Sequence, residues 1–303
     1  MTRAGKTGGG PGSNQYGAKG VSSRAARMGK PRARPPLPLP DVDSVSDEDV
    51  PAPQTVFAVR SPSLDTDALM GLVSSVRPRG VERGLARWRK RLPGLVWNDA
   101  SLEGNAFTLP DVTTLLDGET VDGYSADQVN QVLDLSRAAR IVEEASQRGP
   151  IDVSETLSAR LNAAITAHEI IEPGILRGEG RVRGEATVST MGTTFAALPT
   201  VAGGDELRRA FDQSAGRANA LPHPVARAVA WAGFGAYHQF YGNGNKRTAR
   251  YVMNAVLLSH GFDAILTPMT RKHDYNLALR DMYLTGDLTR YVLFLADLYD
   301  DSH

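Results

Sequence analysis

The chain has 303 residues, of which 41% are hydrophobic and 22% charged, with 34 acidic and 34 basic side chains. This ordinary globular composition is long enough to bury a core in one or two domains. A formal net charge of zero excludes a global field that would attract nucleic acid or an acidic membrane, and the lack of cysteine excludes disulfides and thiolate chemistry.

Residues 1–54 predict a disordered tail. They are rich in Gly, Pro, Ser and Arg, lack apolar periodicity, and cannot bury enough apolar surface to offset the entropy lost on ordering. Basic side chains come first and acidic ones follow. A basic arm that touches nucleic acid is one interpretation, but a solvated tail is preferred, so we do not expect nucleic acid as a partner.

We expect a cytoplasmic protein without a membrane partner. No stretch approaches the roughly 20 consecutive apolar residues that a helix needs to cross a bilayer. Residues 1–10 carry charge without a following apolar core, which does not match a secretory signal.

Helical periodicity dominates after the tail. Its longest amphipathic example runs from Gln128 to Gln147, with Val129, Val132 and Val142 at helical spacing. The predicted helices cover residues 65–76, 80–91, 128–147, 154–169, 205–215, 223–237, 246–260, 271–285 and 288–298.

One stretch departs from helical periodicity. Between Gly174 and Pro199, five glycines stand among β-favouring Val, Thr and Phe residues, which predicts a hairpin. The predicted fold class is therefore mainly α, with one small β-hairpin flap.

Residues 238–250 join two predicted helices through a glycine-rich turn. Gly242 and Gly244 permit backbone angles that are closed to other residues. The second helix begins at Asn245 or Lys246, with Asn245 as its expected cap.

Three cations occupy the start of that second helix, where the helix dipole already favours anions. Lys246, Arg247 and Arg250 repel one another unless an anion lies among them. Orphan N–H groups, a glycine-permitted concavity and converging cations together predict a polyphosphate site. His238 lies just before it, and an ordinary histidine pKa of about 6.5 suits proton abstraction from a hydroxyl that attacks phosphorus.

The segment resembles the signature of the Fic, or Fido, family. That signature reads His-Pro-Phe, two residues of which the second is Asp or Glu, then Gly-Asn-Gly-Arg, two residues and Arg; residues 244–250 carry the match. The resemblance implies a Fic helical bundle with a flap over the active site, and transfer of AMP from ATP to a Tyr, Thr or Ser hydroxyl of a target protein. The implied roles are His238 as general base, Phe240 as a core anchor, Gly244 with Asn245 as a phosphate cradle, and Arg247 with Arg250 as ligands of the outer phosphates.

The segment departs from the family signature at several positions. Gln239 replaces the proline, and the stretch from His238 to Gly244 is one residue longer than usual. Asn243 or Gly242 replaces the acidic residue that normally holds Mg²⁺. An amide oxygen can bind Mg²⁺ but brings no charge, so Asn243 is a weak metal candidate and turnover should be reduced.

A second match lies at residues 99–111 and resembles the inhibitory segment of class II Fic proteins. The family pattern is Ser or Thr, three residues, Glu, then Gly or Asn; Glu103-Gly104 fits, while Asp99 replaces the hydroxyl residue. The resemblance implies that Glu103 pairs with Arg250 and blocks the γ-phosphate position. We therefore divide the chain into the tail at 1–54, an N-terminal helical region at 55–118 and a Fic core at 119–303.

Partners and alternative functions follow from the same resemblance. A target protein would dock by strand addition to the flap, at residues 181–199, and a homodimer is compatible with the family. Lys246 replaces a glycine as in the Doc branch of the family, whose members phosphorylate, which keeps a Fic-fold kinase as an alternative. The others are a de-AMPylase that uses Glu103 and a catalytically weak nucleotide-binding module, which the missing acidic metal ligand favours.

Overall fold

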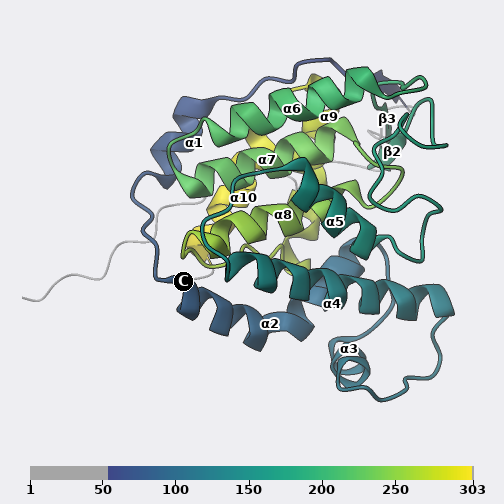
Figure 1. Cartoon of the computed structure of the whole chain (residues 1–303), viewed down its shortest axis with the longest axis vertical. Helices are drawn as coiled ribbons and strands as arrows, with labels where there is room; N and C mark the ends of the chain where they lie inside the picture. The colour runs from purple at the N-terminus through teal and green to yellow at the C-terminus, as the bar shows by residue number, and fades with distance from the viewer. Residues whose placement is uncertain (1–53, 302–303) are drawn as a thin grey trace, which may run out of the picture. The chain divides into compact units, whose positions relative to one another are not determined.

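The computed structural model describes residues 54–301, so nearly all of the predicted tail lies outside the described residues. Within them the fold is mainly α, with ten α-helices and one three-stranded sheet (Figure 1), which confirms the predicted fold class. The helices are α1 (Thr66–Val73), α2 (Val81–Leu102), α3 (Leu109–Leu116), α4 (Ala126–Ser146), α5 (Glu155–Ile165), α6 (Asp205–Asn219), α7 (Pro224–His238), α8 (Asn245–Ser259), α9 (Lys272–Thr285) and α10 (Thr289–Asp301).

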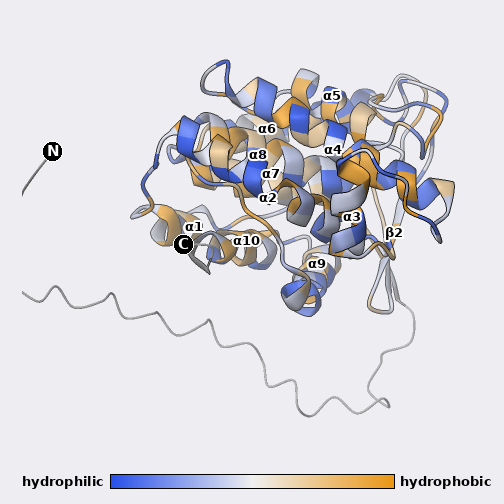
Figure 2. Cartoon of the chain, turned by 90° about the horizontal axis from the view of Figure 1, so that it is seen from below, coloured by the Kyte–Doolittle hydropathy of each residue, from blue (hydrophilic) through white to orange (hydrophobic). Residues whose placement is uncertain are grey.

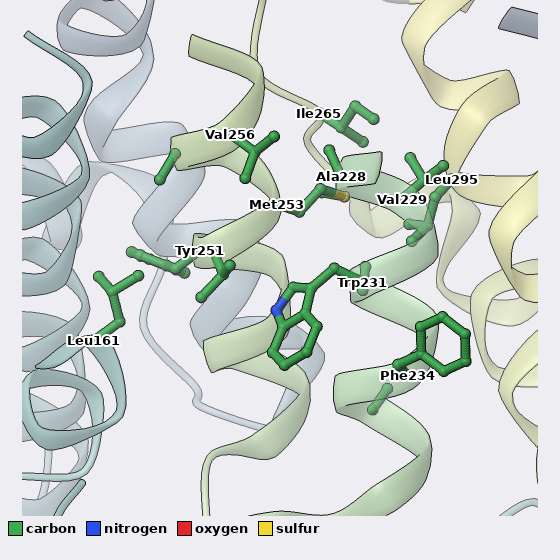
Figure 3. Packing of buried hydrophobic residues seen from close by; sticks show 14 of the residues in the cluster. Leu161, Ala228, Val229, Trp231, Phe234, Tyr251, Met253, Val256, Ile265 and Leu295 are labelled. Carbon is green, nitrogen blue, oxygen red and sulfur yellow. The ribbon is translucent and has the colours of Figure 1, made fainter. Parts of the chain in front are cut away.

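Helices α7 and α8 form the centre of the bundle. They pack more extensively against each other than any other pair of elements, and α4, α5, α6 and α10 surround them. Nearly every residue of both helices is buried. In Figure 3, Trp231 of α7 points toward α8, whereas Phe234 points from α7 to the other side of the core.

The outer helices are amphipathic, and hydrophilic and hydrophobic residues alternate along them (Figure 2). Helix α4 buries Val132, Leu135 and Val142 on one face. Its start is fixed by a capping box in which Ser125 and Gln128 bond to each other's backbone N–H groups. The periodicity that predicted these helices is therefore the periodicity of core contact.

Three predicted helix ends are wrong by four residues or more, and one of them is the end of α6, which continues to Asn219 rather than ending at residue 215. Helix α2 continues to Leu102 rather than ending at Arg91, because Pro93 is accommodated inside it and buried Leu95 and Val96 keep its apolar face on the core. Helix α5 ends at Ile165 rather than Glu169. The observed ends of α2 and α5 determine where the acidic side chains near the polyphosphate motif lie.

The predicted hairpin is confirmed as β2 (Thr187–Thr190) and β3 (Thr193–Ala196), which pair antiparallel. A third strand, β1 (Gln54–Phe57), pairs parallel to β3, so the strand order is β1-β3-β2. The sequence analysis did not predict β1, because a four-residue strand whose partner lies about 140 residues away leaves no local pattern. Among the described strands, β2 keeps a free edge.

None of the described helices is long and apolar enough to cross a bilayer. The predicted boundary between an N-terminal region and a core at residues 118 and 119 stays a prediction.

Replacement of the central tryptophan should test the importance of the α7–α8 contact. Trp231 is 1% exposed, so Trp231→Ala should lower the free energy of unfolding by about 3–5 kcal/mol through lost burial and a cavity. Urea denaturation measures this difference. The matched control is Val201→Ala at a side chain that is 79% exposed, where a change below about 0.5 kcal/mol is expected; equal losses in the two variants would contradict the assignment of the core.

Candidate functional site

The turn between α7 and α8 is held by a glycine and an asparagine. Gly244 has a φ of +72°, and a Cβ there would lie 2.5 Å from Thr166 Cγ2, so no other residue fits without strain. Helix α8 begins after Gly244 with no side-chain cap. Asn245 does not cap it as predicted, because its amide instead bonds the backbone N–H and carbonyl of Tyr241 and the Oε1 of Gln239.

The uncapped start of α8 carries the three predicted cations, and each one meets a carboxylate of the same chain. Arg250 Nε lies 2.8 Å from Asp99 Oδ1, and Arg250 Nη2 lies 3.6 Å from Glu103 Oε1. Lys246 Nζ lies 3.3 Å from Glu103 Oε2. Carboxylates of the chain itself, and not a bound nucleotide as expected, therefore supply the counter-charge in this structure.

Arg247 has the closest partner of the three. Its Nη1 and Nη2 donate to Glu169 Oε1 and Oε2 at 2.5 and 2.6 Å, in a bidentate pair. Glu169 was not among the predicted site residues. It lies beyond the C-terminus of α5, within the range that was predicted to be helical.

Helix α2 brings the predicted inhibitory residue to the cations. Asp99 and Glu103 are four residues apart at the end of α2, so they project from one face. Burial opposes ionisation of Glu103, yet Lys246 and Arg250 hold the pKa of its carboxyl below the usual value. The expected contact between Glu103 and Arg250 is present, and Asp99 adds a pair that the resemblance did not imply.

A cavity of about 450 Å³, here called the flap cavity, lies between the start of α8 and the flap. Gly244, Asn245, Lys246 and Arg247 line it together with Glu103 and flap residues 185–189. The structure therefore brings most predicted phosphate-binding residues to one cavity. Arg250 does not line this cavity, because its side chain is buried against Asp99 and Tyr275.

His238 is not brought to this cavity. Its side chain is buried at the end of α7, where its ring lies 5.2 Å from that of Phe240, and its Nδ1 has no hydrogen-bond partner. Burial, with a smaller effect of Arg217, lowers the pKa of His238 to about 4. The structure thus differs from the expectation that His238 faces the phosphates: its imidazole packs in the core and does not line the flap cavity, and its role as a base stays a prediction.

Gln239, rather than His238, is among the residues that line the flap cavity, although it is largely buried. Its side chain donates to the Ala236 carbonyl and accepts from Asn245. The sequence contained the signal: counted back from Gly244 without a gap, the family's histidine falls on Gln239 rather than His238. Alignment on the His-x-Phe triplet concealed this register.

Phe240 and Arg177 fix the loop from opposite sides. Phe240 is buried against Phe211 and Trp231, with ring centroids 4.9 and 6.0 Å away. Arg177, which the sequence analysis missed, donates to the carbonyls of Gln239, Gly184 and Leu198. It ties the loop to both ends of the flap, and burial lowers its pKa to about 10.

The residues at the predicted metal position do not fit Mg²⁺ as they stand. Asn243 Oδ1 accepts from the Gly244 N–H, and Asn243 Nδ2 donates to Glu169. Among residues 54–301, no group of three His, Cys, Asp or Glu side chains could hold a metal ion.

Curated proteins with similar sequences share one name, although no family model matches the chain. It is 27% identical over 210 residues to the protein adenylyltransferase Fic of Culex quinquefasciatus, and 26% identical over 208 residues to that of Drosophila melanogaster. Each match covers 67% of this chain and 39% of the relative. The chain thus spans well under half the length of these relatives.

Solved structures share the fold at lower identity. A Fic-domain-containing signaling protein from Bacteroides thetaiotaomicron aligns with a TM-score of 0.61 and 20% identity, over 78% of this chain and 92% of that one. A Fic family protein from Desulfovibrio desulfuricans aligns with a TM-score of 0.58 and 20% identity, over 80% and 74% of the two chains. These likenesses place the helical bundle and its flap among Fic folds.

The burial of His238 predicts a pH dependence of stability. The unfolded chain takes up a proton on this residue below its ordinary pKa of about 6.5, whereas the folded protein resists protonation until about pH 4. Stability should therefore fall as the pH drops through this window, by at most about 1.4 kcal/mol per pH unit. His238→Leu removes this contribution, and urea unfolding at about pH 7 and about pH 5 measures it; identical pH slopes for the two proteins would contradict a buried neutral His238.

Proposed function

We propose that this chain, a member of the Fic family, binds ATP with its phosphates at the N-terminus of α8 and acts as a weak, self-restrained adenylyltransferase. The observation that supports ATP binding most directly is the uncapped start of α8, which combines free N–H groups, Gly244 at positive φ and three cations beside one cavity. The names of the curated relatives support AMP transfer as the reaction.

Restraint follows from the contacts of Glu103. Its carboxylate lies against Lys246 and Arg250 and lines the flap cavity, so a phosphate and this carboxylate compete for the same cations. In the resting protein the cations are neutralised. ATP binding therefore exchanges one anion for another, which lowers the net gain in free energy relative to an open site.

The weakness of the transfer step follows from Gln239. When a target hydroxyl attacks the α-phosphorus, the O–P bond forms, pyrophosphate leaves and the hydroxyl proton must be accepted. An amide is not a base at neutral pH, and general-base catalysis typically contributes about 10²–10⁴-fold. A catalytically weak nucleotide-binding protein, the earlier alternative, is thus favoured over a fast transferase by this one residue.

The flap supports a docking mode for the target. Strand β2 keeps a free edge among the described strands, and residues 185–189 line the cavity that holds the phosphate motif. An extended peptide that pairs with β2 would carry a hydroxyl to the cavity mouth. This mode is tolerant of sequence, because backbone groups supply the hydrogen bonds.

Removal of the Glu103 carboxylate should tighten ATP binding. Because two cations lose their competitor, isothermal titration should show Glu103→Ala binding ATP about tenfold more tightly than wild type. Glu144→Ala, which removes a surface carboxylate paired with Arg160, is the matched control and should match wild type. Absence of ATP binding by every variant would reject the proposed nucleotide site.

A histidine at position 239 should increase AMP transfer. In the Glu103→Ala background, Gln239→His places an imidazole on the cavity wall and should raise labelling from α-labelled ATP by about 10²-fold or more. His238→Leu should leave labelling unchanged, because that side chain lies outside the cavity. Loss of labelling in His238→Leu, or transfer of label from γ-labelled ATP instead, would contradict the proposed chemistry; the second result would indicate a kinase.

A further inference from the structure

Glu169 occupies the face of Arg247 that would bind a phosphate. A guanidinium presents its two terminal nitrogens as a fork, and this fork fits a carboxylate and a phosphate equally well. In this structure both arms of the Arg247 fork are taken by the two oxygens of Glu169. A further donor, Arg247 Nε, is buried and has no hydrogen-bond partner.

Arg247 cannot serve both anions in full. Its side chain is 4% exposed, so a second anion has no open approach to a fork that Glu169 already holds. One carboxylate also neutralises the single positive charge of the guanidinium. The fork becomes available to a phosphate only when Glu169 leaves.

The surroundings of Glu169 allow it to leave without disturbing the core. Glu169 lines a second cavity of about 440 Å³, here called the α4 cavity, which Gln131, His168, Asn243 and Arg247 also line. Its other partners are the side-chain amides of Gln131 and Asn243, at 3.3 and 2.9 Å. Because α5 has ended before this point, rotation of one side chain into the α4 cavity is sufficient.

We infer that Glu169 is a second carboxylate lock on the phosphate site, separate from Glu103 in sequence and in the cation that it holds. The inference rests on the proposed ATP site and adds its regulation: Glu103 restrains Lys246 and Arg250, and Glu169 restrains Arg247. A polyphosphate must displace both. The opposite role, in which Glu169 orients Arg247 for phosphate, predicts the reverse effect of removing it.

Inorganic tripolyphosphate is the direct probe, because it carries the phosphate chain without a base or sugar. Isothermal titration on the full chain compares wild type, Glu169→Gln, Glu103→Ala and the double variant. Since charge-assisted hydrogen bonds to Arg247 are freed for the phosphate, Glu169→Gln should bind roughly tenfold more tightly than wild type. The double variant should bind more tightly than either single variant. Glu144→Gln, at the surface pair with Arg160, should equal wild type.

Stability measurements keep the test decisive if the variant is weakened. Glu169→Gln leaves Arg247 without a counter-charge and should melt at a lower temperature than wild type, and saturating tripolyphosphate should restore it. Glu169→Asp keeps the charge with a shorter reach and should bind with intermediate affinity. Unchanged or weaker binding by Glu169→Gln, while Glu103→Ala binds more tightly, would overturn the lock and assign Glu169 to orientation. If no variant binds, the ATP site itself is rejected together with its lock.

Discussion

The start of α8 gathers Lys246, Arg247 and Arg250, of which the two arginines are almost fully buried, and the rest of the site follows from how those charges are balanced. Two segments far apart in the sequence supply three carboxylates: the end of α2 carries Asp99 and Glu103, and the segment after α5 carries Glu169. Buried ion pairs gain little net stability, because both charges lose their hydration. Their consequence here is positional: α2 and the segment after α5 are drawn onto the same turn of α8.

The loop before α8 is fixed by backbone requirements rather than by charge. Glycine is the only residue type that fits against Thr166 at the positive φ of position 244. Asn245 and Arg177 form hydrogen bonds to backbone groups of the loop that have no partner in a helix. Phe240 holds the loop to the core. The geometry of this loop is therefore set by contacts other than the ion pairs around the cations.

Local patterns predicted the helices, the hairpin and the phosphate motif, because each depends on residues within about one or two turns of each other. The rest depends on contacts between distant segments. Strand β1 exists only because β3 accepts it, and α5 ends early where Glu169 turns toward Arg247. The expected position of the base was a different kind of error. His238 and Gln239 are neighbours and both are buried, and only the packing of distant segments decides that Gln239, not His238, lines the flap cavity.

Binding and chemistry are separable in this protein because they depend on different elements. The cradle and cations belong to α8 and its N-terminal turn, whereas a base would have to come from the end of α7, where the helix rotation places His238 in the core and an amide at the cavity. Under the proposed function, the ion pairs restrain nucleotide binding, and the lack of an imidazole at the cavity restrains the transfer step. If nucleotide exchange for Glu103 and Glu169 moves α2 and the segment after α5, the bound state itself, rather than the transfer of AMP, becomes the main output of the fold.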